Sequence, residues 1–107
     1  PMFRGILSTI YVERKNNITA TKILDYLKKY YKRNKFIRIY KKNELIGTKN
    51  VINTNYCDIS VCETIDKNTL VILSAIDNLI KGGAGQAIQN LNIKYGFNIS
   101  EGLNKWE

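Results

Sequence analysis

Two cysteines are the first candidates for chemistry in this sequence, but the residues that usually activate a cysteine are absent. Cys57 and Cys62 lie in one short stretch, and the 107 residues include no histidine. Without histidine there is no ordinary base to activate a thiol or a serine hydroxyl, and two thiols alone cannot form an ordinary zinc site. Five residues apart on an extended strand, the two cysteines would be ~17 Å from each other, too far for a disulfide. We therefore expect two reduced thiols and no catalytic centre within these residues.

A second candidate is the glycine-rich stretch from Ile76 to Asn92, IDNLIKGGAGQAIQNLN. After its glycines, apolar residues recur at helical spacing: Ala84, Ala87, Ile88, Leu91 and Tyr95. The polar positions between them carry uncharged amides: Gln86, Gln89, Asn90 and Asn92. Uncharged amides favour a surface that packs against another domain or a ligand. The alternative is a strand–loop–helix corner in which the glycines only let the backbone pack closely.

The same stretch resembles the DNL-KGAAGQAVQN segment of the N-acetyl-γ-glutamyl-phosphate reductases, which are NADPH-dependent enzymes of arginine biosynthesis. Two further segments match this family: PMFRGILST at residues 1–9 is similar to its PM-RGILST, and NYCDI at residues 55–59 to its SNY-DI. One departure is Gly83, where the family usually has alanine. The resemblance spans nearly the whole chain. It implies that residues 1–107 are the C-terminal portion of a substrate and dimerisation domain of the semialdehyde-dehydrogenase type.

The resemblance also implies a reaction. In the family, a cysteine thiolate attacks the acyl phosphate of N-acetylglutamyl 5-phosphate, and the thioester then takes a hydride from NADPH to give N-acetylglutamate 5-semialdehyde. The nucleophilic cysteine of the family lies in a glycine-cysteine-tyrosine motif, and this motif and the catalytic histidine fall upstream of Pro1. We therefore expect no catalytic residue and no cofactor bound by this chain alone. Its expected contribution is substrate positioning and subunit contacts in a cytoplasmic homo-oligomer.

Arg4 is the candidate for substrate binding, because its place in PM-RGI resembles a substrate-side position. A guanidinium suits bidentate capture of a carboxylate or a phosphate. The alternative is an arginine at the start of a strand that pairs with a nearby acid.

Asn78, Lys81, Gly82 and Gly85 lie in the segment that resembles the cofactor-facing elbow of the family. Asn78 could bind a nicotinamide carboxamide, and backbone N–H groups at the helix start could bind an anion. Alternatively, Asn78 caps the elbow and Lys81 is solvated. We expect residues 83–96 to pack toward a dinucleotide-binding domain that lies outside this sequence.

A net charge of +8 also raises the possibility of a small basic nucleic-acid-binding α+β module. Nine of the seventeen basic residues lie between Lys28 and Lys49. However, isoleucine, lysine and asparagine make up 42 of the 107 residues, a skew that loads any exposed face with lysine. The glycine–aromatic pattern of RNA-recognition strands is absent, so we expect no specific nucleic-acid partner. No apolar run reaches the length of a membrane span.

The periodicity predicts an α+β fold, with a mostly antiparallel or mixed sheet of about four strands and two helices. Thr19 is the expected N-cap of the first helix, which we expect to end around Asn34. The first strand is apolar on both faces, which favours burial on both. Short connections favour antiparallel neighbours. The expected strands are Gly5 to Val12, Phe36 to Lys41, Tyr56 to Glu63 and Thr69 to Ile76.

Overall fold

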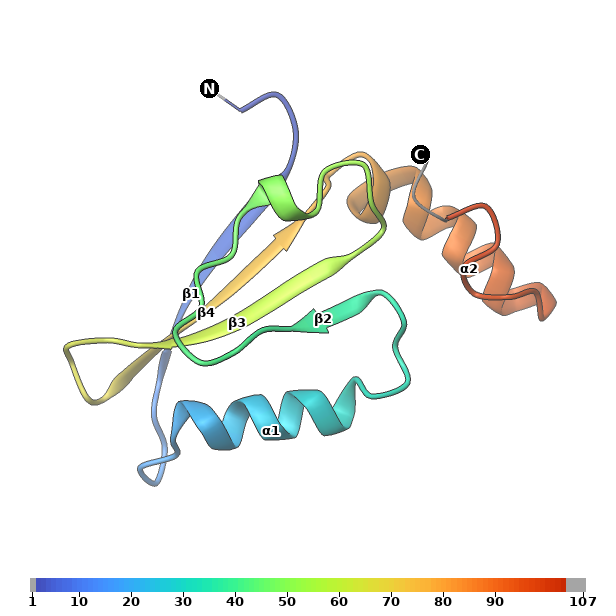
Figure 1. Cartoon of the computed structure of the whole chain (residues 1–107). Helices are drawn as coiled ribbons and strands as arrows, with labels where there is room; N and C mark the ends of the chain where they lie inside the picture. Colours follow the sequence, from blue (N-terminus) through green and yellow to red (C-terminus); the bar gives the residue numbers. More distant parts are fainter. Residues whose placement is uncertain (1, 104–107) are drawn as a thin grey trace.

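A computed structural model describes residues 2–103; Pro1, which opens the PM-RGI motif, and residues 104–107 lie outside the described part. The fold is α+β, as predicted, with a mixed sheet in the order β1-β4-β3-β2 (Figure 1). The elements in chain order are β1 (Ile6–Glu13), α1 (Ala20–Tyr30), β2 (Ile37–Ile39), the 3-10 turn η1 (Thr48–Asn50), β3 (Cys57–Glu63), β4 (Thr69–Ile76), the π-helical turn η2 (Ile80–Ala84) and α2 (Gly85–Tyr95).

The central strands β3 and β4 form an antiparallel hairpin, and β1 pairs with the other side of β4, also antiparallel. The prediction of antiparallel neighbours is wrong for β2, which runs parallel to β3 with Ile37 opposite Cys57. A parallel pair needs a long connection, and residues 40–56 supply it. This connection carries η1 and crosses the sheet before β3 begins (Figure 1).

Each face of the sheet is covered by a different segment. On one face α1 buries Ala20 and Leu24 against Val61 and Leu70. On the other face the connection between β2 and β3 buries Ile46 and Val51 against Leu73 and Ala75. The alternation of side chains along a strand separates these two clusters, so β3 and β4 are covered on both sides.

Strand β1 contradicts the prediction that the first strand is buried on both faces. Four of its apolar side chains are exposed, from 44% at Leu7 to 72% at Tyr11, whereas Val12 is partly buried against the cluster beneath α1. The reason is position: β1 is at the edge of the sheet, and the residues of α1 and of the β2–β3 connection pack mainly over β3 and β4. Apolarity alone did not determine burial here.

The start of α1 and the end of α2 follow local sequence signals. The Thr19 hydroxyl accepts a hydrogen bond from Lys22 N at 3.3 Å, as the N-cap rule predicts. Helix α1 ends at Tyr30, before the predicted Asn34, and continues as turns. Helix α2 ends at Gly96, whose φ of 72° is the left-handed conformation that glycine adopts at low cost.

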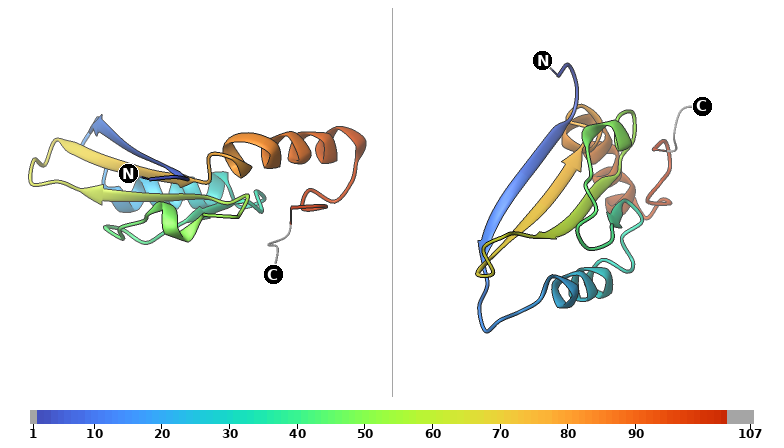
Figure 2. Two further views of the ribbon diagram at one scale, coloured as in Figure 1. Left: turned by 90° about the horizontal axis from the view of Figure 1, so that it is seen from above. Right: turned by 60° about the vertical axis from the view of Figure 1, so that its left-hand side comes forward.

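Helix α2 projects beyond the end of the sheet, near the C-terminal end of β4 (Figure 2). Its apolar residues Ile88, Leu91 and Tyr95 are 39–62% exposed, whereas Asn92 is buried beneath the returning segment at residues 97–103. Across residues 2–103, no helix combines the length and apolarity needed to cross a membrane.

Candidate functional site

The two segments that resemble the reductases meet at one buried carboxylate. Asp77 lies directly after β4 and is fully buried. Its Oδ1 accepts hydrogen bonds from the backbone N–H groups of Leu79 and Ile80, at 2.9 and 3.0 Å. Its Oδ2 accepts from Asn53 N at 2.8 Å and lies 2.8 Å from Arg4 Nε. Asp77 therefore joins the N-terminal segment, the β2–β3 connection and the elbow before α2.

The surroundings of Asp77 stabilise its charged form. Burial alone would raise the pKa of this carboxyl, but the N–H groups of Asn53, Leu79 and Ile80 and the Arg4 guanidinium lower it, and their sum leaves the pKa below its ordinary value. Asp77 is therefore an anion in the folded chain at neutral pH. Sequence reasoning missed this residue, although an aspartate immediately before a helical turn is a standard N-cap signal.

Arg4 pairs with a nearby acid, Asp77, which is the alternative to substrate binding that the sequence left open. The contact is an ion pair through Nε, but the N–H of Nε is not aimed well enough at Asp77 for a hydrogen bond. The side chain is 32% exposed. Because the ion pair uses Nε, it leaves the two terminal Nη nitrogens for a second anion.

Asn78 makes a different contact from the one expected. Its Oδ1 accepts a hydrogen bond from Gly5 N at 2.7 Å, which ties the start of β1 to the elbow. Asn78 does not cap the elbow, because Asp77 does. With Oδ1 engaged, the amide NH₂ group of Asn78 is the part that can meet a ligand.

Several of the elbow N–H groups that were expected to bind an exogenous anion already have an internal acceptor. Leu79 and Ile80 donate to the Asp77 carboxylate, and Gly82 N donates to the Asp77 carbonyl oxygen at 2.9 Å. These three N–H groups are therefore engaged within the chain and are not available to a ligand phosphate.

The two predicted elbow glycines have different surroundings. A Cβ on Gly82 would meet nothing closer than 3.4 Å, and this glycine is exposed. A Cβ on Gly85 would collide with the Asn55 side chain and would lie 2.8 Å from the Ile80 carbonyl oxygen. Gly85 is thus required for the close approach of α2 to residue 55, which is the packing alternative considered from the sequence.

Lys81 is half-buried and not solvated. Its Nζ donates to Gln89 Oε1 at 2.9 Å, and the same oxygen accepts from Asn55 Nδ2 at 2.9 Å. Burial lowers the pKa of Lys81, and the nearby Cys57 opposes this shift more weakly. The ammonium group lies 5.9 Å from the centre of the Phe36 ring. The structure therefore connects the elbow to the NYCDI segment through polar side chains.

A second buried carboxylate was also missed. Asp58 on β3 is fully buried and receives two hydrogen bonds from Arg38, from Nε to Oδ1 at 2.6 Å and from Nη2 to Oδ2 at 2.8 Å. Arg38 Nη2 also donates to the Asn50 carbonyl oxygen at 3.1 Å. The hydrogen bond with Asp58 raises the pKa of Arg38, whereas burial raises the pKa of Tyr40 beside them. This pair holds the β2–β3 connection against the sheet.

The cysteines are free and half-buried. Cys57 Sγ lies 3.5 Å from Ser74 Oγ, and Cys62 packs against the cluster around Ile46. Among residues 2–103, no group of three or more cysteine, aspartate or glutamate side chains has the arrangement of a metal site.

Comparison with known proteins adds two findings. A family model described as the dimerisation domain of semialdehyde dehydrogenases matches residues 1–78. The chain is 46% identical over 103 residues to the N-acetyl-gamma-glutamyl-phosphate reductase of Oceanobacillus iheyensis, and 45% identical over 105 residues to that of Staphylococcus aureus strain USA300. These alignments cover 96% and 98% of the chain but only 30% and 31% of the relatives.

The chain therefore spans about a third of the length of the curated relatives it matches. The resemblance inferred from the three motifs is confirmed, and the basic nucleic-acid-binding alternative receives no support from these matches. The fold, a mixed sheet with helices, agrees with the matched domain. By the match over most of its length, this chain belongs to the dimerisation-domain family of the semialdehyde dehydrogenases.

Proposed function

We propose that this chain is the C-terminal part of an NADPH-dependent N-acetyl-γ-glutamyl-phosphate reductase of arginine biosynthesis. In this proposal it positions the substrate and joins subunits, while a cysteine and a histidine outside residues 1–107 carry out acyl transfer and proton transfer. The observation that carries the proposal is the identity of 45–46% to reductases over nearly the whole chain. The convergence of the PM-RGI and DNL segments at Asp77 supports it.

Arg4 is the residue proposed to bind the substrate. The ion pair with Asp77 restricts Nε, so the guanidinium is held in place before any ligand arrives. A preorganised arginine loses less conformational entropy on binding than a free one. Its Nη nitrogens would then bind a carboxylate or phosphate oxygen of the acyl phosphate.

The elbow fits an uncharged part of the cofactor better than a phosphate. Two of its backbone N–H groups donate to the Asp77 carboxylate, and Lys81 is engaged with Gln89. The NH₂ group of Asn78 and the exposed backbone at Gly82 remain for the nicotinamide end, and Gly85 contributes by keeping α2 close to residue 55. When bound, the dinucleotide would supply the hydride; this chain would only orient it.

The outer surface of α2 is proposed to pack against the dinucleotide-binding domain. Residues 83–96 expose Ile88, Leu91 and Tyr95, whose burial elsewhere would be favourable at about 25 cal/mol per Å². The enzyme is proposed to be a cytoplasmic homo-oligomer, in keeping with the dimerisation-domain family.

Complementation tests this function. A gene that encodes this chain together with its upstream segment should restore growth without arginine to a reductase-deficient strain, and the isolated 107-residue chain should not. In the purified parent enzyme, Arg4→Lys should raise KM for the acyl phosphate about tenfold, because an ammonium cannot bind bidentately. Arg33→Lys, an exposed arginine just beyond α1, is the matched control. Failure of a well-expressed parent gene to restore growth would refute the proposal.

A further inference from the structure

One oxygen of the Asp77 carboxylate serves two groups that are far apart in the sequence. Asp77 Oδ2 accepts a hydrogen bond from the backbone N–H of Asn53 at 2.8 Å and lies 2.8 Å from Arg4 Nε. The other oxygen, Oδ1, is held by the N–H groups of Leu79 and Ile80. The position of Oδ2, and with it the ion pair with Arg4, therefore depends on where the N–H of Asn53 points.

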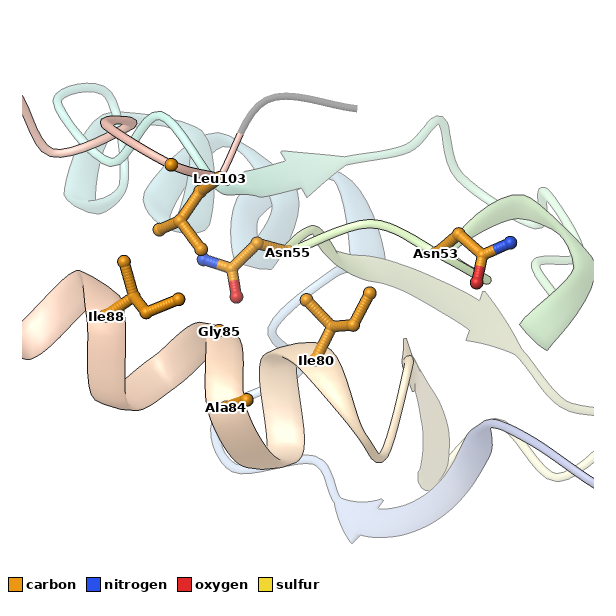
Figure 3. A pocket seen from close by; sticks show the side chains of 8 residues that line it. Asn53, Asn55, Ile80, Ala84, Gly85, Ile88 and Leu103 are labelled. Atoms are coloured by element: carbon orange, nitrogen blue, oxygen red, sulfur yellow. The ribbon is translucent and has the colours of Figure 1, made fainter. Parts of the chain in front are cut away.

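Asn53 lies in a tight turn shortly before β3. The turn is closed by a hydrogen bond from Thr54 N to the Val51 carbonyl oxygen at 3.0 Å, and the Thr54 hydroxyl donates to the same oxygen at 2.7 Å. Val51 and Thr54 are buried, whereas Asn53 is exposed. Figure 3 shows its side chain directed away from Asn55 and from α2. The contact with Asp77 is made by the backbone of Asn53 and not by this side chain.

The direction of the Asn53 N–H depends on the backbone conformation of this residue. Its φ is 61°, which lies in the left-handed region. In a four-residue turn, a positive φ at the third residue belongs to one orientation of the central peptide bond, and a negative φ belongs to the opposite orientation. A negative φ at Asn53 would therefore turn its N–H away from Asp77 and bring the Ile52 carbonyl oxygen toward the carboxylate. Asparagine and glycine adopt the left-handed region readily, but a β-branched residue is strained there.

A second contact ties the β2–β3 connection to the segment that carries Arg4. Gly5 has a φ of 106°, and a Cβ placed on it would lie 2.6 Å from Thr48 Cβ. The turn η1 therefore packs directly against the main chain next to Arg4. A carbonyl oxygen of η1 accepts a hydrogen bond from Arg38 Nη2 at 3.1 Å, which holds η1 to the sheet. The connection thus contacts both the main chain beside Arg4 and, through the tight turn, the acid that pairs with Arg4.

We propose that Asn53 is a positioning residue, whose left-handed backbone aims an N–H at Asp77 Oδ2 and thereby holds the Arg4 guanidinium with its Nη nitrogens free for an anionic group of the substrate. The substrate part of this inference rests on the proposed function, whereas the link from Asn53 to Arg4 does not. With the central peptide bond reversed, the Ile52 carbonyl oxygen would repel Oδ2 and attract the guanidinium. Arg4 would then reorient toward Ile52 and away from a ligand.

The link to Arg4 is tested with variants of this chain. Asn53→Val should shift the ¹H–¹⁵N signal of the Arg4 Nε–H group, because valine disfavours a positive φ. Asn53→Gly should leave the signal in place, since glycine keeps the left-handed conformation and the asparagine side chain is not needed. Asn53→Ala, with a smaller strain than valine, should shift the signal in the same direction by less.

Asn43→Val is the matched control. Asn43 is exposed, has a φ of 60° and donates its N–H to the Val61 carbonyl oxygen, near the other end of β3. The same strain therefore arises away from Asp77, and the Arg4 signal should not move. An unchanged Arg4 signal in both Asn53→Val and Asn53→Ala, or equal shifts in Asn43→Val and Asn53→Val, overturns the proposal.

The consequence for the substrate is measured in the purified parent enzyme. Asn53→Val should raise KM for the acyl phosphate about fivefold and change kcat by less than about twofold, since a displaced binding group weakens substrate binding and leaves the reacting groups in place. Asn53→Gly should keep the KM of the wild type. Asn43→Val should keep it as well, because a loss of stability alone reduces the amount of folded enzyme and not its KM.

The two measurements separate this inference from the proposed function. If the Arg4 signal shifts in Asn53→Val but KM does not change, the link from Asn53 to Arg4 stands and the role of Arg4 in substrate binding is refuted. If neither changes, the whole inference is refuted. If the parent enzyme does not reduce the acyl phosphate, the reductase function is refuted, while the Arg4 signal still decides whether Asn53 positions Arg4.

Discussion

Strands β1 and β3 show opposite relations between sequence and burial. β1, with the sequence ILSTIYVE, is the more apolar of the two, yet Ile6, Leu7 and Ile10 are 44–46% exposed. β3, with the sequence CDISVCE, buries Asp58 and Ser60 completely. The difference shows that burial in this fold is determined by the place of a strand in the sheet, and less by its own hydropathy.

The buried polar residues of β3 are stable because each has a partner. Asp58 is paired with Arg38 on the neighbouring parallel strand. The hydroxyl of Ser60 donates to the Glu44 carbonyl oxygen at 2.6 Å. Burying a polar group costs little when it is hydrogen-bonded. Both partners come from residues 37–51, so the connection that makes β2 parallel to β3 also satisfies the interior of the sheet.

The largest expected difference in unfolding free energy is between two leucine-to-alanine substitutions, one on the covered strand β4 and one on the exposed strand β1. Leu70→Ala on β4 removes a fully buried side chain from the cluster beneath α1 and should lower the free energy of unfolding by about 3–4 kcal/mol. Leu7→Ala on β1, which is 44% exposed, should cost about 1 kcal/mol or less. Urea denaturation of both variants measures the difference. Equal losses would mean that β1 is covered in solution.

The next effect tests the buried ion pair. Arg38→Met keeps much of the side-chain volume but leaves Asp58 buried without its partner, which should cost about 2–3 kcal/mol; the value lies below that of a fully buried pair because Arg38 is 37% exposed. Arg33→Met, an exposed position just beyond α1, should change the unfolding free energy by less than about 0.5 kcal/mol. If Arg38→Met were equally mild, Asp58 would have to be satisfied by another group.

A third effect depends on pH and concerns Asp77, the buried carboxylate at the end of β4. Asp77→Asn places an NH₂ group or an uncharged oxygen against donors and should cost about 2 kcal/mol at neutral pH. The folded-state pKa of Asp77 is below its ordinary value of 3.8. Its contribution is therefore complete above the unfolded-state pKa and is lost as the pH falls through the folded-state pKa.

The difference in unfolding free energy between wild type and Asp77→Asn should consequently decrease below about pH 4. Urea denaturation at a series of pH values checks this. Asp25→Asn on the exposed side of α1 is the control, with an expected change below about 0.5 kcal/mol at neutral pH. A gap that stays constant down to the acid limit would assign the loss to packing and not to charge.

Local sequence signals predicted where the strands and helices lie. The direction of β2 and the exposure of β1 depend on contacts between distant segments, which the sequence did not predict. The bounds of β4 were predicted to the residue, since its apolar run is bracketed by turn residues. The parallel pairing of β2 was not predicted, because nothing in residues 36–41 specifies a neighbour twenty residues away. The exposure of β1 was also mispredicted, since coverage depends on where α1 and the β2–β3 connection pack.

In the candidate site, too, some features have a local sequence signal and others depend on contacts between distant residues. The motifs located the elbow and Arg4, and the N-cap rule could have identified Asp77 from its position before the turn. The contact between Asn55 and Gln89 joins residues 34 positions apart and has no local signature. The need for glycine at position 85 likewise appears only when Asn55 is seen against the helix.

A substitution on the exposed edge of β1 should hardly change the folding stability of the chain, but it should change self-association more than any other substitution considered above. Within residues 2–103 the outer edge of β1 pairs with no other strand, and an unpaired edge with exposed apolar side chains promotes strand addition. We therefore expect the isolated chain to self-associate. Tyr11→Lys, at a position 72% exposed, should change the unfolding free energy by less than about 0.5 kcal/mol but should weaken association by charge repulsion along the edge.

Sedimentation velocity over a range of concentrations measures this association. Tyr26→Lys makes the same substitution at a similarly exposed position on α1 and should leave the sedimentation behaviour unchanged. If both lysine variants weaken association equally, net charge and not the β1 edge is responsible. A wild-type chain that sediments as a monomer at every concentration would show that the four exposed apolar residues of β1 are tolerated without a partner. The contrast between β1 and β3 would then have no consequence for assembly.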